Sequence, residues 1–247
     1  MTNKFSNMFP WPEEDFSQYG SVEQKTIGKI QQHVGKVMDR NWVSIPHVTH
    51  HDDIDITAIE QRRKDWNNVN PEQKVSILPC LVKAAVEVLK QYPKFNCSLS
   101  ADGSTVTQKS YYHIGIAVDV ESGLLVPVVR DCDVKSVTEV AADINDKSTR
   151  AKTKGLPMSD MSGGCFTLSS LGHIGGTGFT PIINAPEVAI LGICKARQAV
   201  SLDSAGHIES RLMLPLSLSY DHRVINGADA ARFMVAFSEA LDLVQFS

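Results

Sequence analysis

The sequence predicts an α+β fold, a two-layer sandwich of a mixed β-sheet and helices. Apolar residues at helical spacing occupy the first third and the end of the chain, whereas β-rich runs are massed between them. Two of these runs are separated only by Glu121, Ser122 and Gly123, which indicates a hairpin connection. Strands joined by hairpins, with helices gathered at the two ends, favour this fold over a βαβ repeat.

In the first third, apolar residues recur at a spacing that predicts a helix over residues 21–42. Pro46 then enforces extended backbone, so residues 45–56 are expected to form a strand. Two further helices are predicted, over residues 57–66 and over the strongly apolar residues 75–91, where Tyr92-Pro93 ends the second.

The rest of the chain is expected to be mostly strand. The β-rich runs of the hairpin span residues 111–120 and 124–130, and an amphipathic helix is predicted to follow over residues 136–152. Residues 165–168, 188–194 and 211–220 are predicted strands, and residues 228–244 a closing helix.

The composition is that of a globular protein with one substantial core. The chain has 247 residues, of which 43% are hydrophobic and 21% charged. We expect an extended N-terminal arm over residues 1–20, where prolines remove donors and fix φ, and one domain over residues 21–247. The net charge of -4 argues against a general nucleic-acid-binding role.

Neither a membrane protein nor a secreted protein is predicted. No apolar run reaches the roughly 18 residues that a membrane-spanning helix needs. The first fifteen residues include polar and acidic residues where a signal peptide has an apolar core, so a cytoplasmic location is expected.

Three sets of residues that could suggest other chemistry have simpler interpretations. The five cysteines are widely spaced without a CxxC pair, so each is expected to pack as a small apolar side chain. Histidines and aspartates crowd residues 47–55, but neighbouring strand residues face opposite sides, and no metal site is expected. The glycines of residues 172–178 are interpreted as turn formers and not as a dinucleotide-binding loop.

The segment 216–228 carries the strongest functional signal. A strand that alternates apolar and hydroxyl residues leads directly into the cluster Asp221-His222-Arg223, and Gly227 then turns the chain into the closing helix. His222 is therefore expected at the end of a rigid element, which is the support that a catalytic group needs. By itself, a histidine after a strand is more often a structural hydrogen-bonding residue than a catalyst.

The run from Asp221 to Gly227 resembles the signature of the dihydrolipoamide acyltransferases of 2-oxoacid dehydrogenase complexes. That signature is Asp-His-Arg followed two residues later by Asp-Gly, and this chain has Asn226 where the family usually has Asp. Chloramphenicol acetyltransferases and peptide-synthetase condensation domains share a shorter His-x-x-x-Asp-Gly core. The likeness covers residues 11–244 and is nearest to the bacterial acetyltransferases of the pyruvate dehydrogenase complex, with further family blocks at residues 40–49, 112–128, 166–172 and 183–192.

The resemblance implies a chloramphenicol-acetyltransferase-like fold and acetyl transfer between a dihydrolipoyl thiol and coenzyme A. His222 would be the general base that takes the thiol proton, and Ser169 would donate a hydrogen bond to the tetrahedral oxyanion. The alternative for Ser169 and Ser170 is that they cap a turn before Gly172. Asn226 could orient a neighbour through hydrogen bonds, but it carries no charge.

For coenzyme A the resemblance implies contacts from residues on several elements. Arg63 could meet a phosphate with its forked guanidinium, the alternative being a solvated surface charge. Asp119 could accept a hydrogen bond from the ligand, the alternative being that it only ends a strand. The implied set for coenzyme A is Arg63, Ser76, Asp119, Ser169, Ser170 and Gly192, and no metal is implied.

The resemblance also implies a homotrimer, with the histidine from one chain and the serine from its neighbour in each active site. Relatives assemble eight trimers into a 24-subunit cube through an apolar C-terminus, and this chain ends in the shorter and more polar residues 243–247. No lipoyl module is recognisable, so the dihydrolipoyl group would come from another domain or protein. Two alternatives stay open, a stand-alone coenzyme-A-dependent acyltransferase for another small acceptor and, in view of Asn226, a catalytically silent scaffold trimer.

Overall fold

A seven-stranded mixed sheet forms the centre of the protein in a computed structural model, which describes residues 12–121, 123–202 and 205–246. The strand order is β1-β11-β9-β8-β4-β7, and β10 also pairs with β11. β8 runs parallel to both β4 and β9, and the other pairs are antiparallel, which confirms the predicted mixed sheet. The strands are β1 (His47–Asp55), β4 (Ile114–Ile116), β7 (Val128–Val129), β8 (Phe166–Ser170), β9 (Ala189–Ile193), β10 (Arg197–Leu202) and β11 (Ile208–Asp221).

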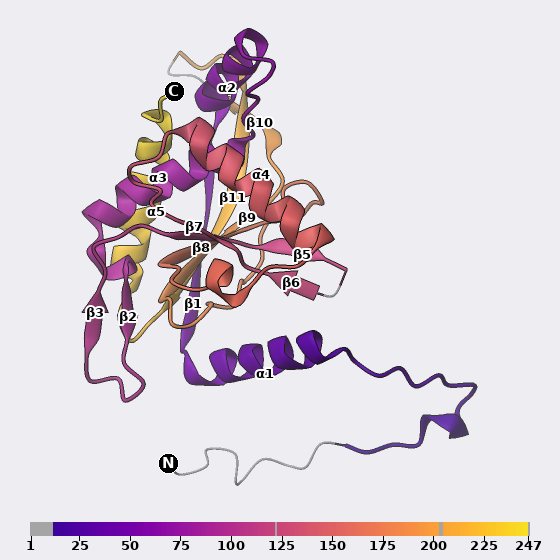
Figure 1. The fold of residues 1–247 in the computed structure, drawn as a ribbon. Coiled ribbons are helices and arrows are strands. Elements are labelled where there is room, and N and C mark those ends of the chain that lie inside the picture. The colour runs from indigo at the N-terminus through magenta and orange to yellow at the C-terminus, as the bar shows by residue number, and fades with distance from the viewer. Residues whose placement is uncertain (1–11, 122, 203–204, 247) are drawn as a thin grey trace.

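Helices cover one face of this sheet (Figure 1). Apolar residues of α3, α4 and α5 form one buried cluster with alternate residues of the strands, including Ile114, Leu168, Leu191 and Leu218. Burial of each such side chain stabilises the fold by about 1.5 to 3 kcal/mol. The helices are α1 (Lys29–Ser44), α2 (Thr57–Val69), α3 (Ile77–Gln91), α4 (Val137–Thr153) and α5 (Gly227–Asp242), with short 3-10 turns η1 (Phe16–Gln18), η2 (Pro93–Phe95) and η3 (Met158–Met161).

The opposite face of the sheet is more polar and is partly covered by the long loop 171–188. Thr49 and Ser219 bond to each other across β1 and β11 at 2.8 Å. The loop contacts this face through Phe179, whose ring lies over Gly192, and through Ile183, which packs against Ile190. The alternation of residues along each strand therefore divides the sheet into an apolar helix-covered face and a face with hydroxyl groups.

The two predicted β-rich runs do form a hairpin, but its two arms are shorter than expected. It joins β5 (Val118–Val120) to β6 (Gly123–Leu125) in a small sheet of their own. The outer parts of the two predicted runs belong instead to the main sheet as β4 and β7. A second small hairpin, β2 (Cys97–Leu99) with β3 (Val106–Gln108), was not predicted from the sequence.

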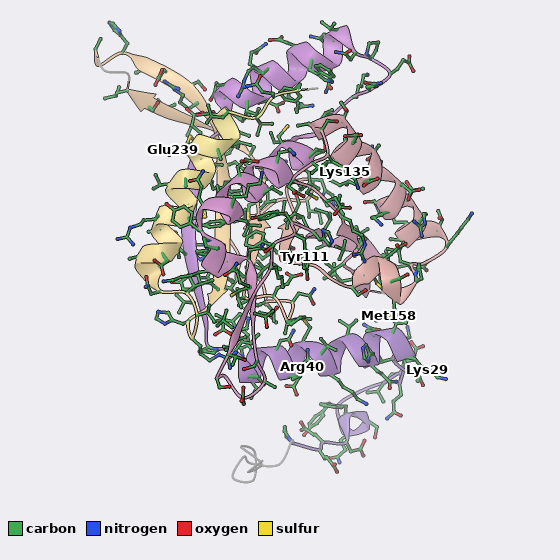
Figure 2. All side chains as sticks on the ribbon, turned by 60° about the vertical axis from the view of Figure 1, so that its left-hand side comes forward. Lys29, Arg40, Tyr111, Lys135, Met158 and Glu239 are labelled. Carbon is green, nitrogen blue, oxygen red and sulfur yellow. The ribbon has the colours of Figure 1, made fainter. Side chains whose placement is uncertain are left out.

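The largest difference from the sequence prediction is at the N-terminal side. The helix expected over residues 21–42 begins only at Lys29, because Gly28 has an extended conformation with φ -61° and ψ 150°. Residues 12–28 extend away from the body of the protein, whereas α1 lies along one side of the body with most of its surface exposed, as Figures 1 and 2 show, with Lys29 and Arg40 labelled on the helix. The apolar side chains exposed there include Phe16, Tyr19, Val22, Ile27, Ile30 and Trp42.

The remaining predictions agree with the structure apart from their ends. α2 extends three residues beyond the predicted end at residue 66, and β11 begins three residues earlier than expected. All five cysteines are buried and free, as predicted, and residues 172–178 lie in the loop after β8. Within the described residues, no helix is both long and apolar enough to cross a bilayer. Of the predicted arm, residues 1–11 lie outside the described residues.

Candidate active site

His222 stands directly after the last residue of β11, at the end of a rigid element as expected. Its backbone N–H donates to the carbonyl oxygen of Pro46 at 3.1 Å, which ties the turn to the start of β1. Its side chain is exposed, and its ring lies 6.0 Å from that of Tyr220. The imidazole is therefore open to a substrate while its backbone is held.

The residues on both sides of His222 fix the turn electrostatically. Asp221 is 2% exposed, and its carboxylate accepts hydrogen bonds from the Arg223 guanidinium, the shortest at 2.6 Å. The backbone N–H of Arg223 also donates to this carboxylate. A buried carboxylate needs such a paired arrangement, because an isolated buried charge is costly. The ion pair thus holds the backbone on either side of the histidine.

Asn226 is the N-cap of α5. Its side-chain oxygen accepts a hydrogen bond from the backbone N–H of Asp229 at 2.9 Å, while its own backbone is extended. This is the usual role of a short polar side chain before a helix. The cap fixes the direction in which α5 leaves the His222 turn.

Ser169 lies inside β8, which corrects the expectation that it follows the strand. It pairs with Gly192 of β9, and Ser170 pairs with Ile193. Both serines are half-buried and belong to the strand, and Ser170 is its last residue before the turn that contains Gly172. Gly192 allows a close approach: a Cβ there would lie 2.6 Å from Cζ of Phe179, so no larger residue fits without movement of the ring.

The strand register separates Ser169 from His222 within one chain. Ser169 pairs with Gly192, which in turn pairs with Ser217, so the three residues form a row across the sheet. His222 lies five residues beyond Ser217 along the chain, or roughly 17 Å at strand geometry, and two strand spacings add roughly 10 Å at right angles. At this geometry the two residues of one chain are roughly 20 Å apart, too far to act together on one carbonyl group.

Arg63 and Ser76 line the same depression, of about 340 Å³, with Lys74 and residues of α4. The guanidinium of Arg63 is neither a solvated surface charge nor a free fork. Its Nε and Nη2 donate to Glu60 at 2.7 Å each, and its Nη1 donates to the carbonyl oxygen of Val75. The hydrogen bonds from Arg63 hold the pKa of Glu60 below its usual value. A phosphate could accept a hydrogen bond only from the N–H groups of Arg63 that these contacts leave free, or by displacing Glu60.

The other residues expected to contact coenzyme A lie on different elements. Asp119 is exposed in the middle of β5 and faces Leu124 of the small hairpin, so it does not end its strand. The structure therefore brings the predicted residues together in separate groups, with Arg63 beside Ser76, and Ser169 and Ser170 beside Gly192.

Glu187 is a notable polar residue that the sequence did not single out. It is 4% exposed, and its Oε2 accepts a hydrogen bond from the Thr167 hydroxyl at 2.7 Å. Gly164 leaves room for its other oxygen, 2.6 Å from where a Cβ would stand. Burial raises the pKa of this carboxyl to about 7. The only sequence signal was a charged residue immediately before an apolar strand.

The histidines of β1 have protein partners. Nε2 of His47 accepts a hydrogen bond from the backbone N–H of Ile183, so its Nδ1 carries the proton that is donated to Ile45 O at 2.8 Å. Nδ1 of His51 bonds the hydroxyl of Ser217 at 2.8 Å. No grouping of three or more metal-ligating side chains occurs among the described residues.

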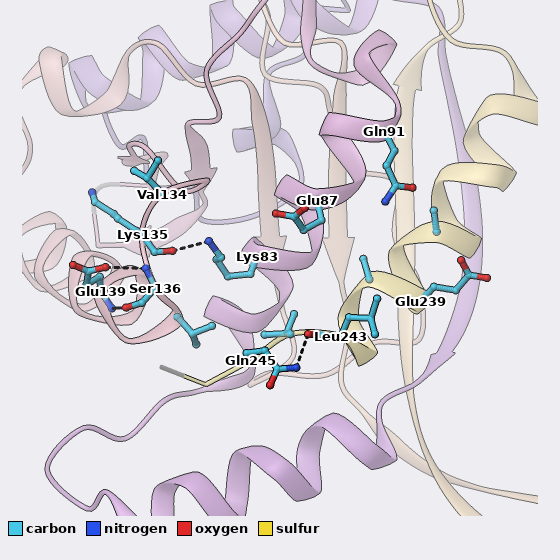
Figure 3. A pocket seen from close by; sticks show the side chains of 14 residues that line it. Lys83, Glu87, Gln91, Val134, Lys135, Ser136, Glu139, Glu239, Leu243 and Gln245 are labelled. Carbon is cyan, nitrogen blue, oxygen red and sulfur yellow. Dashed lines mark hydrogen bonds between the residues drawn. The ribbon is translucent and has the colours of Figure 1, made fainter.

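A depression of about 650 Å³ on the described surface contains none of the predicted site residues. It lies between α3, the start of α4 and the end of α5, and Figure 3 shows charged side chains such as Glu87 and Glu139 around it. The ammonium of Lys83 there donates to the backbone oxygens of Cys132 and Lys135, which ties α3 to the loop before α4.

Comparison with known proteins identifies the family. Residues 19–246 match the model described as 2-oxoacid dehydrogenases acyltransferase (catalytic domain). The acetyltransferase component of the pyruvate dehydrogenase complex from Pseudomonas aeruginosa is 50% identical over 234 residues, which are 94% of this chain. The chain spans only 43% of the length of that relative.

Two solved structures, each 46% identical to this chain, cover 95% of it with TM-scores of 0.91 and 0.92, and 97% of each solved chain is matched. The first concerns the role of a serine, a histidine and an asparagine in the catalytic mechanism of Azotobacter vinelandii dihydrolipoamide acetyltransferase, in which the asparagine comes four residues after the histidine. The second is the cubic core of a pyruvate dehydrogenase multienzyme complex.

A more distant solved structure supports the predicted fold class. Chloramphenicol acetyltransferase is 16% identical, with a TM-score of 0.57, and the match covers 88% of this chain and 100% of that one. This likeness concerns the fold alone. It confirms the chloramphenicol-acetyltransferase-like α+β sandwich that the sequence predicted.

Proposed function

Since this chain belongs to the 2-oxoacid dehydrogenase acyltransferase family, as its catalytic domain, we propose that it transfers an acetyl group between a dihydrolipoyl thiol and coenzyme A. Coenzyme A would be a substrate, and the dihydrolipoyl group would be carried by another domain or protein. The support is the match over residues 19–246, together with the exposed histidine at the end of β11.

In the proposed reaction, His222 takes the proton from the thiol of coenzyme A, and the sulfur attacks the carbonyl carbon of the acetyl-dihydrolipoyl thioester. Ser169 donates a hydrogen bond to the oxygen that becomes negative. Collapse of the tetrahedral intermediate forms acetyl-coenzyme A, and the departing dihydrolipoyl sulfur receives the proton from His222. Proton transfer of this kind contributes about 10²- to 10⁴-fold, and an oxyanion donor about 10²- to 10³-fold.

The strand register supports a shared site, because at ideal strand geometry it puts His222 and Ser169 of one chain roughly 20 Å apart. If both residues act on one carbonyl, they belong to different copies, so the functional unit is a closed oligomer with sites between protomers. We propose a homotrimer, and a cube of such trimers in view of the related cubic core. The exposed apolar side chains of residues 16–42 suit such contacts.

Asn226 does not favour the silent scaffold as an alternative. The Azotobacter vinelandii relative has the same histidine-to-asparagine spacing, and the asparagine belongs to a study of its catalytic mechanism. The likeness to chloramphenicol acetyltransferase supports no particular acceptor, because it concerns the fold alone. The cytoplasmic location expected from the composition stays a prediction.

The activity is tested by incubating the protein with acetyl-coenzyme A and either dihydrolipoamide or a panel of alcohols and amines. Rapid thioester formation on dihydrolipoamide is expected, and transfer only to an alcohol or amine would assign the chain to the stand-alone acyltransferases. His222→Ala and Ser169→Ala should each lower kcat by about 10²-fold or more.

The sharing of the site is tested by mixing these two variants under conditions in which protomers exchange. An interface is active only if one protomer supplies an intact His222 and its neighbour an intact Ser169. When the two variants are mixed in equal amounts and exchange at random, about one interface in four meets this condition, so about one quarter of the wild-type activity should return. Each variant exchanged only with itself is the control. If mixed oligomers form, as native mass spectrometry would show, and no activity returns, the two residues do not act across an interface.

A further inference from the structure

A row of residues crosses the polar face of the sheet beside the proposed oxyanion donor. His51 of β1 pairs with Ser217 of β11, Ser217 pairs with Gly192 of β9, and Gly192 pairs with Ser169 of β8. Because neighbouring strands are about 4.8 Å apart, the whole row spans about 14 Å. Its members are therefore close enough to be linked through the loop that covers this face.

Ser217 makes that link through its hydroxyl. It is 0% exposed, lies 2.8 Å from Nδ1 of His51 and accepts a hydrogen bond from the backbone N–H of Phe179 at 3.3 Å. A hydroxyl can accept one bond and donate another at the same time. The His51 ring also packs over Gly178, where a Cβ would lie 3.5 Å from Nδ1. The side chains of β1 and β11 thus fix the backbone at residues 178–179.

The Phe179 ring covers Gly192, which is the neighbour of Ser169 in this row. The ring lies so close that a Cβ on Gly192 would be 2.6 Å from Cζ and 2.8 Å from Cε1 of the ring. Gly192 is the direct neighbour of Ser169 across β8 and β9. The ring therefore stands about one strand spacing, roughly 4.8 Å, from the serine that would receive the oxyanion.

We propose that His51 and Ser217 are positioning residues that hold the Phe179 ring as the wall limiting the size of the transferred acyl group. The proposal rests on the proposed function, because it takes Ser169 as the oxyanion donor. When the carbonyl oxygen is bound at Ser169, each further carbon lengthens the acyl chain by roughly 1.5 Å. A methyl group fits within the space of one strand spacing, whereas a longer chain requires the ring to move.

The proposal makes a specific demand on selectivity. An apolar pocket distinguishes one methylene by about 10- to 200-fold, so Phe179→Ala should raise the ratio of kcat/KM for butyryl-coenzyme A to that for acetyl-coenzyme A at least about tenfold. Ser217→Ala, which frees the loop but keeps the ring, should change the ratio in the same direction by about threefold. Adding Ser217→Ala to Phe179→Ala should change the ratio no further, because the group that it positions is gone.

Two more variants separate positioning from general support of the fold. His51→Gln offers hydrogen-bonding atoms at a similar reach and should keep the wild-type ratio, whereas His51→Leu should resemble Ser217→Ala. Ser210→Ala, on the exposed part of the same strand where the hydroxyl bonds Gln198, is the matched control and should leave the ratio unchanged. Thermal unfolding and oligomeric size are compared for all variants.

The ratio decides the outcome. If Ser217→Ala lowers kcat/KM equally for acetyl-, propionyl- and butyryl-coenzyme A, or only raises KM for dihydrolipoamide, the proposal is wrong. In that case an active wild-type protein would leave the proposed function intact. A wild-type protein without thiol acetylation would overturn both.

Discussion

The buried carboxyl group of Glu187 should make the stability of this protein depend on pH in an unusual direction. Its surroundings are the Thr167 hydroxyl, the close backbone of Gly164, Asn184 and the more distant ammonium of Lys109. Burial outweighs the favourable effect of these groups, so the pKa rises from 4.5 to about 7. Glu187→Gln keeps the shape and the acceptor for Thr167 but removes the ionisation.

The sign follows from the raised pKa. Between pH 4.5 and about 7 the folded protein retains a proton that the unfolded chain has released, so the free energy of unfolding falls as the pH rises through this window. At 1.36 kcal/mol for each pKa unit, the whole effect is about 3 kcal/mol. Glutamine has no charge to bury. The free energy of unfolding of the variant should therefore rise relative to that of the wild type by about 2 to 3 kcal/mol between pH 5 and pH 8.

Urea unfolding of both proteins across this pH range, at one protein concentration, measures the difference. The matched control is Glu121→Gln, at an exposed site, for which the difference from wild type should not vary with pH. A Glu187→Gln difference that is constant across the range, or that grows toward low pH, would refute the reasoning.

Two other substitutions test the surroundings of the site. Asn226→Ala removes the cap of α5 and should lower the free energy of unfolding by about 1 kcal/mol in urea titrations. Asn226→Asp can still accept the hydrogen bond from the backbone N–H of Asp229 and should cause no such loss, so equal losses for the two variants would contradict the capping role. Gly192→Ala places a methyl group against the Phe179 ring and should lower the free energy of unfolding by about 1 to 3 kcal/mol, with recovery when it is combined with Phe179→Leu. A Gly192→Ala variant as stable as the wild type would show that the ring moves aside at little energetic cost.

The fold could be predicted where local signals and tertiary packing agree. α3 and α4 have an apolar face for the sheet and clear ends, at Tyr92-Pro93 for one and at the Ser136 capping box for the other. The predicted start of α1 was wrong because the apolar spacing was continued back through Ile27, whereas the backbone is extended at Gly28 and the apolar side chains before it are exposed. β2, β3 and β10 are too short or too polar to stand out in a sequence.

The site divides in the same way between local and long-range information. The position of His222 followed from one continuous segment, and the structure places it as expected. The burial of Glu187 and the link from His51 through Ser217 to Phe179 depend on tertiary contacts. The ion pair between Arg63 and Glu60, three residues apart on α2, is local, and it was not predicted from the sequence. Side chains brought together by folding give no pattern in one sequence. The resemblance supplied candidate roles, but it could not show how far Ser169 lies from His222.

The wide spacing of His222 and Ser169 on a single sheet has a consequence for the newly made protein. If the proposed pairing holds, a freshly synthesised chain is inactive however well it folds, since the two groups that must act on one carbonyl lie too far apart in it. Encounter with its own copies would then be the step that switches the enzyme on. Scarcity of protomers in the cell would limit turnover more steeply than in proportion to their number.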